Sequence, residues 1–322
     1  MHKRILNELT VVMDIRPHNA PLLIKSGREA GADPTLLDMN FVRSIHPTTG
    51  EQVVFLPGSS LKGTLRSYCE RVARSVRPDE EAAWCCNPFS EKDACGRRLE
   101  KVKEPAGRYA GACVACRTFG HTRLGSHLGI SDAYPVGQVK MEQRDGVAID
   151  RISGAVAAGP FNLEVVTQGT FQATLTLRNF QLWQIGWLAV ALRDLKSGLV
   201  PIGFGKSKGF GRVAVIYRKA TIAYPGQWQA QRCGLDFAAN LYDLTAFEFE
   251  GREEYNLAPA PKTPVSLPAK GQLVENGDYG RVAVELADGK AIEDLLLSAV
   301  AAWKAAVETW PWVRQVGGDK DD

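Results

Sequence analysis

Three stretches of the chain carry apolar residues in the pattern that strands show. Residues 9–15 form an almost continuous apolar run that Pro17 closes, residues 171–177 alternate between apolar and polar side chains, and residues 212–217 form a second apolar run after Arg212. A period of two places every second side chain on one face of a strand. In residues 183–195 the apolar positions recur at helical spacing. We therefore predict three strands and a helix that packs one apolar face on the sheet.

A further strand and helix precede these elements. The short apolar run at residues 53–56 meets Pro57 and Gly58, which are typical of the end of a strand. Ser59 and Ser60 are expected to cap the helix that follows. Strand, helix and strand then occur twice along the chain. This order predicts an α+β fold, a ferredoxin-like (RRM-like) core with large insertions.

The chain divides into a core and a C-terminal extension. We assign residues 1–218 to the core, with one insertion at about residues 79–124 and an extended hairpin at about residues 136–168. Residues 219–322 form the extension. It contains a strap rich in proline, and its apolar residues over 291–309 have the spacing of an amphipathic helix that packs on the core.

Overall charge says little about binding partners. The 322 residues include 39 Lys and Arg and 36 Asp and Glu, which gives a net charge of only +3. A surface for nucleic acid must therefore come from local clustering of cations. No apolar run is long enough to span a membrane, and the N-terminal residues do not resemble a secretory signal. We expect a cytoplasmic protein that has no membrane partner.

One such cluster of cations lies on the predicted helix after Gly58. Its members are Lys62, Arg66, Arg71, Arg74 and Arg77, against the single acid Glu70. The free N–H groups at a helix start and nearby cations suit a phosphate backbone. Ser59, Ser60, Lys62 and Arg66 are the candidate contacts. The alternative is an ordinary basic helix face in water.

Cysteines indicate a metal site. Five of the seven lie between residues 85 and 116, and Cys113 and Cys116 have the spacing of a zinc knuckle. Cys95 and Cys86 supply two more thiolates, although Cys85 competes with Cys86. The insertion has few large apolar residues, so a structural Zn²⁺ would hold it together. The alternatives are a reduced thiol cluster or a redox pair; the remaining cysteines, Cys69 and Cys233, are expected to be buried apolar residues.

The glycine-rich segment 203–211 has two possible interpretations. A phosphate-binding P-loop would need glycine where Val200 stands and a helix where a strand is predicted, so ATP binding is excluded. The segment is closer to an RNA-recognition strand motif, in which aromatic side chains stack on bases and cations meet phosphates. Lys206, Lys208 and Phe210 are the candidate contacts. A plain tight loop is the alternative.

Several of these segments together resemble one protein family. They are Pro57-Gly58-Ser59-Ser60-Leu61-Lys62-Gly63 with Leu65-Arg66, Cys116-Arg117-Thr118-Phe119-Gly120, Ser131-Asp132-Ala133, Ile149-Asp150-Arg151, and Gly203-Phe204-Gly205 with Gly209-Phe210-Gly211. The residues of these motifs and the order of the motifs along the chain resemble those of the RAMP superfamily of CRISPR-associated RNA-binding proteins. Within it the chain most resembles the Csm/Cmr-type backbone subunit of type III interference complexes, over roughly residues 10–215.

The resemblance implies an RNA-guided assembly. Such a subunit binds guide RNA (crRNA), stacks with copies of itself or related RAMP subunits in a filament, joins other CRISPR effector subunits and binds target RNA. The hairpin would be a thumb that wedges between nucleotides, with Arg151 on a phosphate or a base. Asn87-Pro88 resembles the turn after the first zinc ligand of the family, which favours Cys86 over Cys85.

The resemblance also implies RNA cleavage. In the backbone subunits that cut, an aspartate precedes the Pro-Gly-Ser-Ser motif, and counting back from Pro57 through Arg43 brings that position to Asp38. Asp38 would hold Mg²⁺ or Mn²⁺ for attack of a 2′-hydroxyl on its own phosphate, and we include Arg43 among the RNA contacts. Asp33 is the alternative candidate for this catalytic role. Members often have histidine where this chain has Leu23.

Two other functions fit the same sequence. The first is a backbone subunit that binds guide RNA and does not cut. The second is an endoribonuclease that matures guide RNA without a metal, using a histidine as general base. The candidates for that base are His18, His46, His121 and His127.

Overall fold

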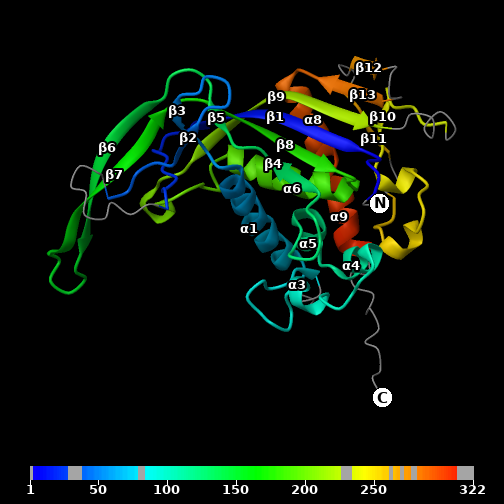
Figure 1. Cartoon of the computed structure of the whole chain (residues 1–322), viewed down its shortest axis with the longest axis horizontal. Helices are drawn as coiled ribbons and strands as arrows, with labels where there is room; N and C mark the ends of the chain where they lie inside the picture. Colours follow the sequence, from blue (N-terminus) through cyan, green and yellow to red (C-terminus); the bar gives the residue numbers. More distant parts are fainter. Residues whose placement is uncertain are drawn as a thin grey trace.

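The computed structural model describes residues 3–27, 38–78, 84–225, 234–260, 264–268, 272–276 and 281–309. An antiparallel sheet runs through the molecule (Figure 1) in the order β12-β13-β9-β1-β8-β4, with β5 also paired to β8. Its strands are β1 (Glu8–Pro17), β4 (Leu128–Ile130), β5 (Tyr134–Pro135), β8 (Phe171–Arg178), β9 (Val213–Tyr224), β12 (Gln272–Asn276) and β13 (Arg281–Leu286).

β1 lies between β8 and β9 in the middle of this sheet. Val11 pairs with Leu175 on one side and Ala220 on the other, and all three are buried. Thr10, which faces the opposite side, pairs with Thr176. The alternation seen in the sequence is therefore the alternation between the core face and the open face of the sheet.

Helices lie on one side of the sheet (Figure 1). They are α1 (Gly58–Val76), α6 (Leu182–Lys196), α8 (Gly289–Ser298) and α9 (Val300–Thr309). The prediction that α6 buries a single face was too narrow, because most of its side chains are buried. The reason is α9, which covers the side of α6 away from the sheet and stacks Trp303 on Trp187 at a ring-centroid distance of 5.0 Å.

The C-terminal helix predicted over residues 291–309 is in fact two helices. α8 and α9 are separated at Ala299. There the backbone of Ala299 presses on Gly186 of α6 so closely that a Cβ at residue 186 would lie 2.1 Å from the Ala299 carbonyl oxygen. The helix breaks at this contact, and no local sequence pattern predicts the break.

Smaller elements extend from the body. β6 (Lys140–Ile149) and β7 (Val156–Gln168) form a long antiparallel hairpin that projects away from the helices (Figure 1). β2 (Arg43–Ile45) pairs with β3 (Gln52–Val54), and of these two strands the sequence predicted only the second, at residues 53–56. β10 (Asn240–Leu241) pairs with β11 (Val265–Ser266).

Short helices complete the structure. α3 (Cys95–Arg98), α4 (Pro105–Gly111) and α5 (Val114–Phe119) lie beside α1 and make up what we call the cysteine lobe, residues 84–124 (Figure 1). The single-turn helices are η2 (Lys206–Lys208), η3 (Leu244–Ala246) and η4 (Arg252–Tyr255). Among the described helices, none combines the length and the apolar character that crossing a bilayer requires.

Candidate functional site

The start of α1 is held by a distant carboxylate. The Gly58 N–H donates to Asp132 Oδ1 at 2.7 Å, and Pro57 is the N-cap residue. Ser59 and Ser60 therefore lie in the first turn and do not cap the helix, which corrects the sequence-based prediction. Glycine is required at residue 58, because a Cβ there would lie 2.2 Å from the carbonyl oxygen of Ile130.

A groove runs between α1 and the glycine-rich segment. Its volume is about 440 Å³, and it is lined by Ile24, Lys25, Ser60, Gly63, Thr64, Ser67, Gly203, Phe204 and Lys206. The small and hydroxyl-bearing side chains of α1 form one wall. The first turn of α1 and the 203–211 segment, which the sequence analysis treated separately, thus meet at one surface.

The glycine-rich segment is fixed against residue 23. Phe204 N–H donates to the carbonyl oxygen of Leu23 at 2.7 Å. Gly203 has a φ of +76°, and a Cβ there would lie 2.2 Å from the same oxygen. Only glycine combines this backbone conformation with so close an approach. The loop that follows carries Lys206 into the groove wall.

Cations gather at this groove. Burial and the nearby positive charge of Arg71 lower the pKa of Lys206. Like charges held close together repel, so a bound anion would relieve the repulsion. Lys25 is exposed on the same surface, and the described lining residues include no acid. The groove suits a phosphate group.

The prediction that Lys208 and Phe210 lie on an RNA-recognition strand is wrong, whereas RNA contact by these two residues stays a prediction. β9 begins only at Val213, so Phe210 precedes the strand and does not lie on the open face of the sheet. Its ring packs under Gly205, within 2.9 Å of where a Cβ would stand. Lys208 is exposed at the end of η2. The segment is a tight loop that positions Lys206.

Two expected phosphate contacts on α1 point toward the cysteine lobe and the segment directly after it. Lys62 Nζ donates to Ser126 Oγ at 2.8 Å. Burial of the Lys62 ammonium and, to a smaller extent, the nearby positive charge of Arg66 lower the pKa of Lys62. The Arg66 guanidinium donates to Gly120 O at 3.1 Å and to Cys116 Sγ at 3.7 Å. Its Nε pairs with Glu70 at 2.8 Å.

The hairpin ends in an exposed apolar tip. Ile149 and Ile152 have exposed fractions of 62% and 97%, and Arg151 is exposed between them. The Asp150 carboxylate accepts hydrogen bonds from the N–H groups of Ile152 and Ser153 and so holds the turn. The tip therefore combines a fixed shape with unburied apolar side chains.

The segment with Asp38 is attached to β7 of this hairpin. Asp38 is exposed, and its Oδ2 accepts the Asn162 N–H at 2.8 Å. Glu164 accepts the Phe41 N–H at 2.9 Å and forms an ion pair with Arg43. This pair occupies the Arg43 guanidinium. Within the described residues no group of three potential metal ligands includes Asp38, and Asp33 lies outside those residues.

Four cysteines of the lobe come together. They are Cys86, Cys95, Cys113 and Cys116; all are buried, and their Sγ atoms lie within 4.8 Å of one another. Four sulfurs placed tetrahedrally about 2.3 Å from a zinc ion stand about 3.8 Å apart. The Cys86 and Cys116 sulfurs are 3.7 Å apart. The cluster therefore fits a metal such as zinc.

Neighbouring donors favour the thiolate form of Cys95 and Cys113. Cys95 Sγ accepts from the Cys113 N–H at 3.3 Å and from Arg98 Nη2 at 3.5 Å. Cys113 Sγ accepts from the Cys116 N–H at 3.5 Å. Hydrogen bonds from Cys116, Cys85, Cys86 and Cys95 hold the pKa of Cys113 well below its usual value.

The other cysteines lie outside the four-sulfur group. Cys85 Sγ contacts the carbonyl oxygen of Glu70 at 3.8 Å, and Cys86 is the member of the Cys85-Cys86 pair that joins the cluster. Cys69 is fully buried on α1, as expected. Cys233 lies outside the described residues.

Three residues with evident roles were not singled out by sequence reasoning. Asp132 was named only as part of a motif, and no pattern in the sequence indicated a role for Lys25 or Glu164. Lys25 lies beside an irregular segment, and Glu164 is a polar residue on a strand where such residues are ordinary. Their roles depend on contacts between distant segments.

Comparisons with known proteins agree with this arrangement. The family model of the RAMP superfamily matches residues 20–214. A search of curated proteins found no match. RAMP superfamily proteins bind crRNA and work in CRISPR complexes. The matched span includes α1, the groove, the hairpin and the cysteine cluster, and it covers more than half of the chain, so this protein belongs to the RAMP superfamily of CRISPR-associated RNA-binding proteins.

Proposed function

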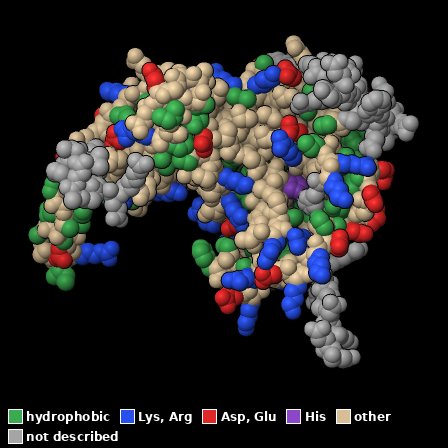
Figure 2. Space-filling model, viewed as in Figure 1, with side chains coloured by type: hydrophobic (Ala, Val, Ile, Leu, Met, Phe, Trp, Pro, Cys, Tyr) green, Lys and Arg blue, Asp and Glu red, His purple; other side chains and the backbone are tan. Residues whose placement is uncertain are grey.

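We propose that this protein is the guide-RNA-binding backbone subunit of a type III CRISPR effector. The observation that carries the proposal is the groove between α1 and residues 203–206, where Lys25 and Lys206 face small and hydroxyl side chains. A groove of this kind holds a phosphate backbone without reading bases. Lys and Arg side chains also gather around the concave outline between the hairpin and the body (Figure 2).

The core that presents this groove is, in our proposal, ferredoxin-like. In chain order its elements are β1, α1, β4, β8, α6 and β9, and the strands lie in the sheet order β9-β1-β8-β4 with antiparallel neighbours. Two strand-helix-strand units interleaved in this way support that assignment.

The hairpin would act as the thumb. An exposed apolar tip costs free energy in water, and a base pair opened by the tip would cover it. Ile152 at the tip and the cation Arg151 beside it suit insertion into a guide–target duplex. In a filament, each copy of the chain would place one such wedge along the duplex.

The cysteine cluster would hold one structural Zn²⁺. A four-thiolate shell leaves no open position for a substrate, so the metal would stabilise the lobe and take no part in chemistry. Cys86, Cys95, Cys113 and Cys116 would be its ligands.

Cleavage of the target would use Asp38. Mg²⁺ is commonly bound by one or two carboxylates together with phosphate oxygens of the substrate, so a single aspartate can suffice once RNA is present. Asp38 is exposed beside the middle of β7, where a base displaced by the thumb would leave its phosphate accessible. Mg²⁺ or Mn²⁺ would stabilise charge on that phosphate during in-line attack.

The metal-independent processing function has less support. Its histidines are held by local contacts: His127 is buried and stacks on Tyr109, and His46 Nδ1 accepts N–H groups from Thr48 and Thr49. A general base needs a free nitrogen near the RNA. A backbone subunit that binds but does not cut is the stronger alternative.

The experiment uses the purified assembly with its guide RNA and a labelled matched target. We expect cuts at a regular interval in Mg²⁺ or Mn²⁺ and none in EDTA. Asp38→Asn should abolish cutting and leave target binding intact, while Asp33→Asn serves as the matched control. Binding without any cut by the wild-type assembly would favour the structural subunit, and products from precursor RNA in EDTA would favour the processing enzyme.

A further inference from the structure

One side of α1 is joined to the cysteine lobe along three turns. Trp84 Nε1 donates to the carbonyl oxygen of Ala73 at 2.7 Å, and Arg74 Nη2 donates to the carbonyl oxygen of Cys86 at 2.9 Å. Ser60, Gly63, Thr64 and Ser67 on the same helix line the groove. α1 therefore contacts the cysteine lobe and also forms a wall of the groove.

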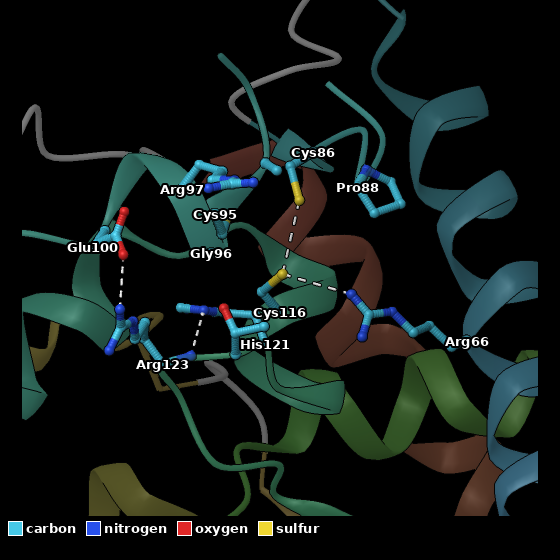
Figure 3. Close-up of a pocket in the computed structure, with 12 residues that line it drawn as sticks. Arg66, Cys86, Pro88, Cys95, Gly96, Arg97, Glu100, Cys116, His121 and Arg123 are labelled. Carbon is cyan, nitrogen blue, oxygen red and sulfur yellow. Dashed lines mark hydrogen bonds and ion pairs between the residues drawn. The ribbon is translucent and has the colours of Figure 1, made fainter. Parts of the chain in front are cut away.

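Arg66 makes the most direct of these contacts. From α1 its guanidinium reaches into the lobe toward Cys116 (Figure 3). Nη2 donates to Cys116 Sγ, Nη1 donates to Gly120 O and Nε donates to Glu70. One side chain therefore bridges a cluster sulfur, the turn after α5 and a carboxylate of its own helix.

The charge of a filled cluster explains why a cation belongs there. Four thiolates around Zn²⁺ carry a net charge of about −2, which is costly to bury without compensation. Arg66 and Arg98 each donate to one of the sulfurs, at 3.7 Å and 3.5 Å.

A cavity of about 610 Å³ also reaches the cluster. Cys86, Cys95 and Cys116 line it together with Arg66 (Figure 3). Three of the four cluster cysteines thus border this cavity, although their side chains are buried. A hydrogen bond to a thiolate withdraws electron density from the sulfur, so it makes the sulfur a weaker nucleophile and slows loss of the metal.

We propose that Arg66 is a positioning residue of the metal centre, which hydrogen-bonds the Cys116 thiolate and fixes the cluster to α1, and that it is not a contact to RNA. The inference rests on the proposed zinc occupancy. It replaces the phosphate contact that the sequence suggested for Arg66. RNA phosphates are met on the groove side of α1, and the guanidinium lies on the lobe side.

The test uses zinc-loaded full-length protein and three variants: Arg66→Gln, Arg66→Lys and the control Arg71→Gln. Arg71 is an exposed arginine of the same helix and contacts the Tyr68 ring, not the cluster. Zinc release is followed with a metallochromic indicator in excess chelator. We expect Arg66→Gln to release zinc roughly tenfold or more faster, Arg66→Lys to recover part of the difference, and Arg71→Gln to match the wild type.

Two further readouts separate this role from a general loss of structure and from a role in RNA binding. In cobalt-substituted protein, Arg66→Gln should shift the sulfur-to-metal charge-transfer absorption, because an N–H···S bond is lost. RNA affinity of zinc-saturated Arg66→Gln should equal that of the wild type. If Arg66→Gln does not fold, the same readouts on Arg66→Lys decide the matter.

Three results would overturn the proposal. They are wild-type release rates in both Arg66 variants, an unchanged cobalt spectrum, and weaker RNA binding by the zinc-saturated variants. A wild-type protein without zinc would instead defeat the zinc assignment itself, and a wild-type protein that does not bind RNA would defeat the proposed function. These failures are distinguishable because each is read on the wild type.

Discussion

The Asp132 carboxylate accepts the N–H of Gly58 at 2.7 Å, and these residues come from segments on either side of the cysteine lobe. Leu56 and Ala133 exchange two backbone hydrogen bonds next to this contact, at 2.9 Å and 2.8 Å. A negative group at the start of a helix satisfies a free N–H and faces the positive end of the helix dipole. Asp132 therefore fixes the end of α1 that lines the groove.

Asp132→Ala should lower the free energy of unfolding by about 1 kcal/mol, because the Gly58 N–H loses its acceptor. Asp132→Asn keeps an acceptor and should cost less. Urea denaturation measures both. Equal stability of wild type and Asp132→Ala would show that the contact does not hold the helix.

Purified protein should contain about one zinc per chain by elemental analysis, since four thiolates with this geometry prefer that metal to hard cations. Cys113→Ser should remove it and lower the melting temperature. Cys69→Ser is the control, because Cys69 is buried on α1 but lies outside the cluster. Zinc retained by a variant lacking all four cluster cysteines would contradict the assignment.

Lys25→Ala combined with Lys206→Ala should weaken RNA binding equally for all sequences, because phosphate contacts carry no base information. Loss of two phosphate contacts to a single strand should reduce the slope of log K against log salt by about 1.4. Fluorescence anisotropy over a range of salt concentrations measures this. The control is Lys290→Ala with Lys304→Ala, two exposed lysines on α8 and α9. An unchanged slope would remove the groove from the RNA path.

Acid should loosen the segment that carries Asp38. Burial raises the pKa of Glu164, but the hydrogen bonds from Arg43 and the Phe41 N–H outweigh it and leave the pKa below its ordinary value of 4.5. A carboxyl group whose pKa is depressed by folding stabilises the protein fully above pH 4.5, and that contribution is lost as the pH falls through the folded-state pKa.

Urea midpoints measured against pH should therefore fall less steeply below pH 4.5 in Glu164→Gln than in the wild type. The exposed Glu51→Gln is the control and should follow the wild type. The protection of the Phe41 amide from hydrogen exchange, relative to the intrinsic rate at the same pH, should fall over the same range. Parallel curves for wild type and Glu164→Gln would show that the ion pair with Arg43 has no net effect.

Local patterns in the sequence predicted the parts of the fold that depend on local physics. The alternation at residues 171–177 corresponds to β8, and the spacing of Cys113 and Cys116 led to a cluster that the structure assembles. Within each of these two signals, the residues that form the pattern are only a few positions apart in the sequence. Strands and metal knuckles are accessible to sequence reasoning for that reason.

What the sequence did not reveal depends on distant contacts. Spacing placed Arg66 on a basic helix face, but the cysteine lobe folds over that face and takes up the guanidinium. The serines after Gly58 looked like caps, but Asp132 reached the free N–H. The single helix at 291–309 was split by the approach of Ala299 to Gly186. Each outcome was decided by a partner at least fifty residues away.

The pairing of β13 with β9 determines where the chain can be shortened. The family match ends at residue 214, within β9, yet Val284 pairs with Ile222 farther along the same strand. A fragment that ended near residue 218 would lose the outer half of β9, the β13 strand and Trp303, and so would uncover Trp187 on α6. Apolar surface and an unpaired strand edge are what drive chains to aggregate. Expression of the family-matched segment alone is therefore a poor route to soluble material, and the C-terminal residues belong in any fragment meant to fold.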